Sequence, residues 1–262
     1  MPHRFVCRWG GLVAVCLLLG ACASTLGREA PRQYALDSLS ASCLKNPLSC
    51  ATGPVQTVGA AVASAAAVGH ALSPEMMTSI KAEMKECANK ARTEVLSRLG
   101  GTFEGLVPKA AECKAMTVDA QGRSVTWAIR LGLEMHEVAL ACAQAKLGER
   151  SLKFSLKPRY RFNRETKEKS LITPEEKAEL LRQGGEQLKG TLEPDVVIHT
   201  GDPLQVLTVY DFKFPCVDFD KAPKWRVYPP GHVYEGRTQG DIYREAFGPD
   251  VELIGAREGV FW

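Results

Sequence analysis

The chain has 262 residues, enough for one large domain or two small ones with a buried core. Hydrophobic residues make up 45% and charged residues 24%, which is ordinary for a globular protein and excludes wholesale disorder. The formal net charge of +3 is too small to indicate a particular class of partner.

The N-terminus has the pattern of an export signal. A basic start precedes an apolar stretch at residues 12–19, which is shorter than the roughly 20 residues that span a bilayer. The sequence Leu-Gly-Ala-Cys at 19–22 resembles a bacterial lipobox, whose cysteine becomes the lipid-bearing first residue. We therefore expect residues 1–21 to be a lipoprotein signal peptide and Cys22 to be a lipid anchor in the outer membrane of the cell envelope. An ordinary cleaved signal is the alternative.

Cysteine usage agrees with export. An even number of cysteines in an oxidising compartment is typical of a disulfide framework, with free buried thiols as the alternative. The sequence does not select among the pairings, although the short loop between Cys43 and Cys50 makes that pair the simplest. Beyond Cys22 the cysteines are Cys43, Cys50, Cys87, Cys113, Cys142 and Cys216.

The first half of the mature chain is expected to be a tether followed by helices. Residues 22–52 are mixed and rich in Ser and Ala, which predicts the tether, and residues 53–148 form the helical region. Residues 58–69 are small and apolar, as in a packed or linker helix, with a role in membrane insertion as the alternative.

Two long helices are predicted within that region. Ser73 and Pro74 have the pattern of an N-cap and first turn, and apolar residues follow at helical spacing. The second helix covers about residues 126–147, again with an apolar stripe. His136 on this helix is expected to be a structural histidine and not a ligand.

The character of the sequence changes after Gly148. Residues 151–162 alternate as a strand does, and Thr173-Pro174 begins a short helix that ends at Gly184-Gly185. Basic and aromatic side chains interleaved around the strand suit a phosphate backbone with stacked bases, whereas a solvated strand face is the alternative. The basic residues are Lys153, Lys157, Arg159, Arg161, Arg164, Lys167 and Lys169.

Residues 192–214 predict a β-hairpin, because two β-branched apolar segments flank turn residues at 200–203. Antiparallel pairing brings Asp195, at the start of the first strand, beside Asp211, near the end of the second. Side chains alternate along a strand, so Asp211 and Lys213 are expected on the same face. Carboxylate oxygens are the ligands that Mg²⁺ or Mn²⁺ prefers, and a lysine beside them orients water and stabilises charge during phosphodiester hydrolysis.

Pro194-Asp195 followed by Asp211-Phe212-Lys213 resembles the PD-(D/E)XK motif of restriction-endonuclease-like nucleases. Gln239 and Tyr243, four residues apart on an expected helix, are similar to the QxxxY element of several of these nucleases. The resemblance implies an α+β fold, in which the helical N-terminal region precedes a restriction-endonuclease-like α/β core with a central mixed sheet at residues 149–262. It implies Asp195, Asp211, Lys213 and Gln239 as catalytic residues, Asp195 and Asp211 as ligands of Mg²⁺ or Mn²⁺, and Tyr243 as a supporting residue. Residues 251–254 would form the last core strand.

Several positions stay open. Many family members place a glutamate on the first core helix as a further metal ligand, and Glu134, Glu137 and Glu186 are alternatives for it. Residues 225–232 form a Pro- and Gly-rich insertion expected to border the substrate groove, with His232 as a conceivable catalytic acid. His199 is expected to be structural.

An exported nuclease resembles the swarm-inhibition lipoprotein toxins, a group of polymorphic toxins that bacteria exchange in competition. This resemblance implies DNA cleavage in the cytoplasm of a recipient cell and a cognate immunity protein in the producer. One alternative is the same fold acting on RNA. Another is a non-enzymatic, disulfide-stapled envelope lipoprotein.

Overall fold

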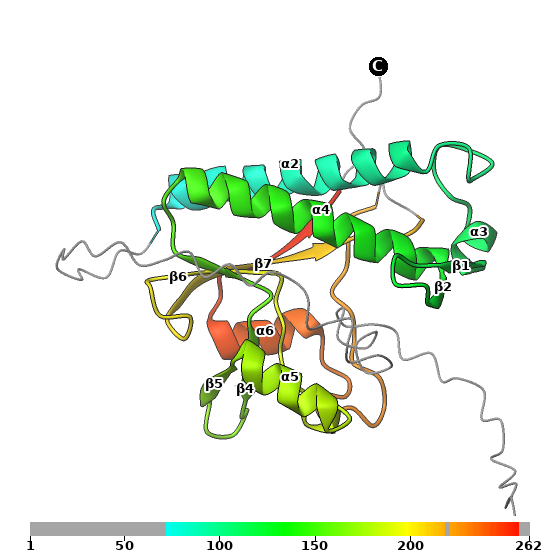
Figure 1. The fold of residues 1–262 in the computed structure, drawn as a ribbon. Coiled ribbons are helices and arrows are strands. Elements are labelled where there is room, and N and C mark those ends of the chain that lie inside the picture. The colour runs from blue at the N-terminus through cyan, green and yellow to red at the C-terminus, as the bar shows by residue number, and fades with distance from the viewer. Residues whose placement is uncertain (1–71, 218–220, 257–262) are drawn as a thin grey trace, which may run out of the picture. The chain divides into compact units, whose positions relative to one another are not determined.

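The computed structural model describes residues 72–217 and 221–256. Within them the chain is a mixed α+β protein, in which a helical region precedes a four-stranded mixed sheet (Figure 1). The helices are α2 (Pro74–Arg98), α3 (Ala110–Lys114), α4 (Trp127–Glu149), α5 (Pro174–Arg182) and α6 (Gln239–Phe247), with a 3-10 turn η2 (Glu186–Leu188). The strands are β1 (Met116–Val118), β2 (Ser124–Thr126), β3 (Phe154–Leu156), β4 (Arg159–Phe162), β5 (Lys169–Ile172), β6 (Val196–His199), β7 (Val206–Lys213) and β8 (Val251–Gly255).

The N-terminal expectations fall outside these ranges. They are the signal peptide (1–21), lipidated Cys22, the tether (22–52), the small apolar run (58–69) and the Cys43–Cys50 pair. No helix in the described part of the chain is both long and apolar enough to cross a membrane.

Local capping explains where three helices begin. The hydroxyls of Ser73, Thr126 and Thr173 accept amide hydrogen bonds from the first turns of α2, α4 and α5, respectively. α2 and α5 also begin with proline, whose missing N–H leaves no donor unsatisfied in a first turn. The three predicted helices are confirmed.

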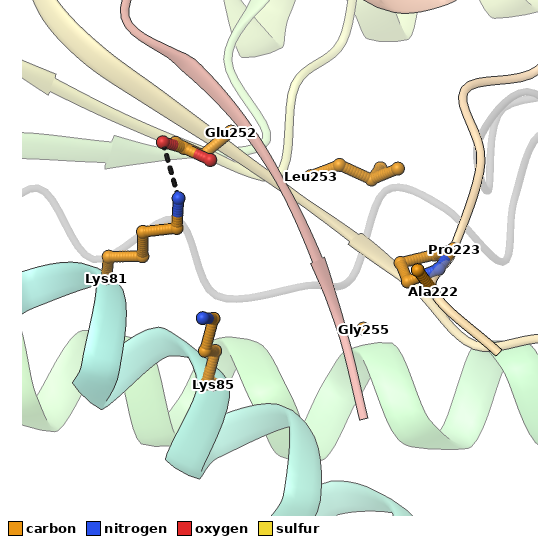
Figure 2. A pocket seen from close by; sticks show the side chains of 7 residues that line it. All are labelled: Lys81, Lys85, Ala222, Pro223, Glu252, Leu253 and Gly255. Atoms are coloured by element: carbon orange, nitrogen blue, oxygen red, sulfur yellow. Dashed lines mark ion pairs between the residues drawn. The ribbon is translucent and has the colours of Figure 1, made fainter. Parts of the chain in front are cut away.

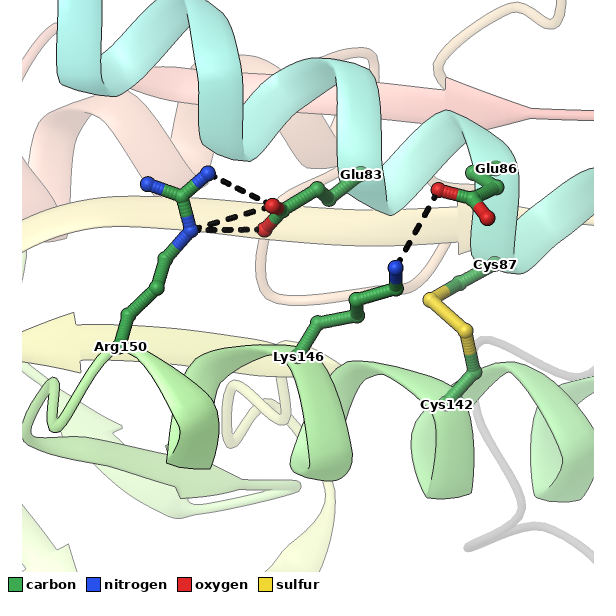
Figure 3. Close-up of a disulfide and its surroundings, with 6 residues drawn as sticks. All are labelled: Glu83, Glu86, Cys87, Cys142, Lys146 and Arg150. Atoms are coloured by element: carbon green, nitrogen blue, oxygen red, sulfur yellow. Dashed lines mark hydrogen bonds and ion pairs between the residues drawn. A yellow bond between two sulfur atoms is a disulfide. The ribbon is translucent and has the colours of Figure 1, made fainter.

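Helices α2 and α4 pack side by side and are joined covalently. A disulfide links Cys87 to Cys142, and further along the two helices Arg150 forms a 2.6 Å ion pair with Glu83 (Figure 3). The sequence alone did not distinguish disulfides from free thiols. In the structure Cys87 and Cys142 form a disulfide.

A second disulfide, Cys113–Cys216, ties α3 to the segment that follows β7. Cys216 lies three residues beyond Lys213. The end of the second hairpin strand is therefore anchored to the helical region.

The sheet has the strand order β3-β6-β7-β8. The β3–β6 and β6–β7 pairs are antiparallel, whereas β7 and β8 are parallel. Helices α2 and α4 cover one face and α6 covers the other (Figure 1). Tyr210 and Phe212 belong to the core under α2 and α4, while Val209 and Val251 belong to the core under α6. The described part of the expected helical region, residues 72–148, thus shares a core with the sheet.

The single strand expected at residues 151–162 is wrong. It is two strands, β3 and β4, which belong to different sheets. The chain turns between them at Lys157, which has a positive φ of 49°, and at Pro158, which has no N–H for a ladder. β3 joins the main sheet, and β4 forms a separate hairpin with β5.

Candidate functional site

The hairpin of β6 and β7 brings two carboxylates together, as its predicted geometry requires. Val196 pairs with Tyr210, so the preceding Asp195 lies opposite Asp211. The Phe212 amide donates a 2.8 Å hydrogen bond to Asp195 Oδ2. Asp195 and Asp211 are 4% and 3% exposed. Two acidic groups this deeply buried need compensating positive charge.

Each carboxylate has a lysine beside it. Lys213 Nζ lies 2.5 Å from Asp211 Oδ2, which places both residues on one face of β7, as expected. Lys157 Nζ lies 3.3 Å from Asp195 Oδ1. The sequence placed Lys157 only among the basic residues of a strand. Its positive φ turns it toward the site, and a positive φ at a lysine has no sequence signature of its own.

His136 on α4, expected to be a structural histidine, lies beside the same carboxylates, a contact that the sequence did not indicate. Its Nδ1 lies 2.7 Å from the Gly132 carbonyl oxygen, which requires a proton on Nδ1. Its Nε2 lies 3.1 Å from the Phe212 carbonyl oxygen and 3.3 Å from Asp195 Oδ2. Both oxygens are hydrogen-bond acceptors. Nε2 therefore either carries a proton that it donates to them or binds a cation together with them.

The two carboxyl groups have opposite pKa shifts. Burial opposes ionisation of Asp195, but the positive charges of His136 and Lys157 outweigh it and lower its pKa below the ordinary value of an aspartate. Burial raises the pKa of Asp211, and the charge of Asp195 raises it further, against the lowering effect of Lys213. Asp211 Oδ2 is buried and has no partner with hydrogen-bond geometry, although it pairs with the Lys213 charge. Opposed pKa shifts in neighbouring acids are typical of functional sites.

Helix α6 presents Gln239 and Tyr243 toward the carboxylates. They are 2% and 1% exposed, and Gln239 Nε2 donates a 2.9 Å hydrogen bond to the Tyr243 hydroxyl oxygen. Burial, followed by the nearby charge of Asp211, raises the pKa of Tyr243 well above its ordinary value. Gln239 Oε1 is buried without a hydrogen-bond partner. A second acceptor in this site is therefore unsatisfied.

Trp225, in the expected groove-bordering insertion, closes one side of the site. Its ring packs on Gly240, where an added Cβ would lie 2.5 Å from the indole. Its centroid is 6.0 Å from that of Tyr243 and 5.9 Å from Lys213 Nζ. The glycine after Gln239 thus allows the ring to sit against the first turn of α6.

The structure brings none of the three open glutamates into contact with Asp195 or Asp211 among the described residues. Glu186 is exposed and pairs with Lys189, and Glu134 pairs with Arg130. Glu137 is exposed on α4, where partial desolvation and the charge of Glu134 raise its pKa.

The other histidines in residues 72–217 and 221–256 are His199 and His232, and both pack against neighbouring side chains. His199 Nε2 is 3.1 Å from Ser155 Oγ, and its Nδ1 accepts from the Gly201 amide, as expected of a structural residue. His232 stacks on Tyr228 with 4.3 Å between ring centroids. Its Nδ1 also accepts a 3.1 Å hydrogen bond from the Tyr234 amide, and neither contact tests its conceivable role as a catalytic acid.

The carboxylate pair fits a divalent cation. Two buried carboxylates, an unsatisfied Asp211 oxygen and the Phe212 carbonyl supply hard oxygen ligands at one end of the hairpin. No group of three or more His, Cys, Asp or Glu side chains in residues 72–217 and 221–256 has a metal-binding arrangement. Mg²⁺ suits such a site, since it keeps several waters and is held by one or two carboxylates.

A pocket of about 190 Å³ lies elsewhere, between α2 and β8 (Figure 2). Lys81 and Lys85 of α2 line it, and Glu252 of β8 pairs with Lys81 at 2.7 Å. It contains none of the residues expected to be catalytic, and its single carboxylate is already paired.

No family model, curated protein or solved structure matches this chain.

Proposed function

We propose that the chain is a divalent-metal-dependent nuclease with a PD-(D/E)XK-type core, which hydrolyses phosphodiester bonds in DNA. The observation that carries the proposal is the buried Asp195–Asp211 pair with Lys213 beside it at one end of the hairpin. Gln239 and Tyr243 face the same place from α6.

The order of the elements supports a restriction-endonuclease-like core. Helix α4 precedes β3, β6 and β7, which form an antiparallel series, and α6 then leads to β8, which is parallel to β7. This arrangement places the hairpin in the middle of the sheet and α6 against its catalytic face. The β4–β5 hairpin and α5 are insertions between β3 and β6.

Asp195, Asp211 and the Phe212 carbonyl would hold Mg²⁺ or Mn²⁺. Such an ion lowers the pKa of a bound water and neutralises charge on the phosphate. Asp195 is suited to this role because its lowered pKa keeps it ionised. Asp211 gains a counter-charge that relieves the cost of its burial.

Lys213 is the residue placed to act on the attacking water. Its ammonium, 2.5 Å from Asp211, donates hydrogen bonds that orient the water and stabilise negative charge on the phosphate. In the reaction the water oxygen bonds to phosphorus and the ester P–O bond breaks. The water loses one proton, and the leaving oxygen gains one. Gln239 Oε1 is an unsatisfied acceptor available to the water or to the substrate.

The toxin context is part of the proposal. A lipobox cysteine, Cys22, would anchor the protein at the outer membrane before transfer, and the nuclease would act in the recipient cytoplasm. A cognate immunity protein would protect the producer. Two disulfides, Cys87–Cys142 and Cys113–Cys216, agree with a protein that passes through an oxidising compartment.

Cleavage of nucleic acid by the purified chain tests the proposal. Supercoiled DNA and single-stranded RNA are incubated side by side with Mg²⁺, Mn²⁺ or a chelator. We expect metal-dependent cleavage of DNA and a loss of at least about 1,000-fold in Asp211→Asn, because the ion and its charge stabilisation are lost together.

Asp202→Asn is the matched control, since Asp202 lies in the turn at the other end of the same hairpin. An asparagine there keeps the acceptor for the Leu204 amide, so full activity is expected. Equal cleavage by wild type and Asp211→Asn would reject the site. Cleavage of RNA alone would support the RNA alternative, and no cleavage of either would support the envelope-lipoprotein alternative.

A further inference from the structure

Lys157 occupies an unusual backbone position, and the inference drawn from it rests on the proposed function. Its φ of 49° lies in the left-handed region that a lysine rarely adopts. Two contacts hold it there: its amide donates a 2.9 Å hydrogen bond to the Asp195 carbonyl oxygen, and its Nζ lies 3.3 Å from Asp195 Oδ1. Strain of this kind persists where surrounding structure enforces it, and it concentrates at functional sites.

The formal charges of the site indicate a role for Lys157 beyond neutralising Asp195. Asp195 and Asp211 are balanced by Lys157 and Lys213 in the structure. Once the carboxylates bind a divalent cation, the two lysines leave two positive charges at the site, and a protonated His136 beside Asp195 adds to them. A phosphodiester brings one negative charge in its ground state and develops a second as water attacks. The charge of Lys157 therefore matches the site to the transition state.

The other groups around Lys157 leave it available to an anion. Arg159 and Lys177 lie on the same side, and both are committed to Glu193. Burial, followed by the charges of Arg159 and Lys157, lowers the pKa of Lys177 to about 8. Glu137 on α4 feels the charge of Lys157 but is exposed. Asp195 is the carboxylate that holds the Lys157 ammonium, and binding of a cation by Asp195 weakens that hold.

We propose that Lys157 is a second phosphate-binding cation, which contacts the scissile phosphodiester on the Asp195 side while Lys213 acts on the Asp211 side. Its side chain is 18% exposed, so the ammonium can reach a bound substrate without leaving the protein interior. A lysine that serves only as the counter-ion of Asp195 would compete with the metal and contribute nothing to the reaction.

Lys157→Met tests this role, because methionine is unbranched, only one atom shorter than lysine, and uncharged. Lys157→Arg keeps the charge, and Lys153→Met is the matched control, since Lys153 is exposed on the same segment. Lysine, methionine, arginine and glutamine are all unbranched at Cβ, so these variants leave the backbone strain at position 157 nearly unchanged. Lys157→Gln replaces Lys157→Met if that protein does not fold.

The measurements are kcat and KM on DNA, together with Mn²⁺ affinity by calorimetry in the absence of DNA. We expect Lys157→Met to lose about 100-fold in kcat/KM, the scale of one lost charge-stabilising donor. Its Mn²⁺ affinity should equal or exceed that of wild type, because a competing cation is gone. Lys157→Arg should recover at least about tenfold of the lost activity, and Lys153→Met should behave as wild type.

Two outcomes overturn the role of Lys157 alone. One is that wild type cleaves DNA and that the kcat/KM of Lys157→Met lies within about threefold of the wild-type value, a difference below 1 kcal/mol. The other is a loss of activity that weaker Mn²⁺ binding fully accounts for. If wild type itself cleaves neither DNA nor RNA, the proposed function fails, whatever the variants do.

Discussion

Two groups of charged residues near α6, one around Glu245 and one around Asp195 and Asp211, show how a structural ion-pair network differs from a candidate reactive site. Glu245, on the outer side of α6, forms ion pairs with Arg164 at 3.0 Å, Lys167 at 3.3 Å and Arg237 at 2.8 Å. Hydrogen bonds from Arg164, the largest effect, lower the pKa of Glu245 to about 2. Its cations face solvent, with side chains 36–59% exposed.

Asp195 and Asp211 differ from Glu245 in burial, and Asp211 also differs in its partners. Both are almost fully buried, each has one lysine beside it, and a buried oxygen of Asp211 lacks a hydrogen bond. The pKa of Asp211 is raised where that of Glu245 is lowered. A carboxylate whose oxygens all have partners stabilises the fold. A buried carboxylate with an unsatisfied oxygen reduces stability, and such groups are typical of functional sites.

Asp211→Asn should therefore increase stability while it abolishes cleavage. Because the folded-state pKa of Asp211 is raised, the stability from its protonated form is present at low pH and is lost as pH rises through that pKa. Asparagine avoids this loss. We expect the thermal midpoint at pH 7 to rise by about 3 °C, roughly 1 kcal/mol for a protein of this size, and the gain to vanish near pH 3.

Thermal unfolding of wild type and Asp211→Asn between pH 3 and 8 checks this. A lower thermal midpoint for Asp211→Asn than for wild type at pH 7 would show that ionised Asp211 stabilises the fold. Asp211 would then resemble Glu245 in its effect on stability.

Glu245→Gln should have the smaller and opposite effect. Its lowered pKa means that ionised Glu245 contributes stability above the ordinary glutamate pKa, and that this contribution is lost as pH falls toward 2. Exposed partners are screened by solvent, so we expect a loss of only about 0.5–1 kcal/mol at pH 7. Cleavage should stay within about twofold of wild type, since Glu245 contacts no site residue. A large loss of cleavage would show that this surface takes part in catalysis.

Local signals explain which parts of the fold were predictable. Caps at Ser73, Thr126 and Thr173 each lie within three residues of the amide that they bind, so the sequence window contains the whole interaction. The proximity of Asp195 and Asp211 also followed from one short hairpin, although a register shift between Ile198 and His199 determines their exact pairing.

Long-range features were not predictable. His136 reaches the Phe212 carbonyl across 76 residues, and its position on an amphipathic helix looks like that of any half-buried histidine. Lys157 was assigned to a continuous strand because the alternation of apolar residues passed through it. Pro158 was the one local indication of a break, and a positive φ at lysine has no sequence signature.

Calorimetric titration with Mn²⁺ tests the central claim, that Asp195 and Asp211 together bind a divalent cation. Wild type and Asp202→Asn should bind the ion alike, while Asp195→Asn and Asp211→Asn should each lose at least about tenfold in affinity, or 1.4 kcal/mol. Equal affinity in all four folded proteins would contradict the account.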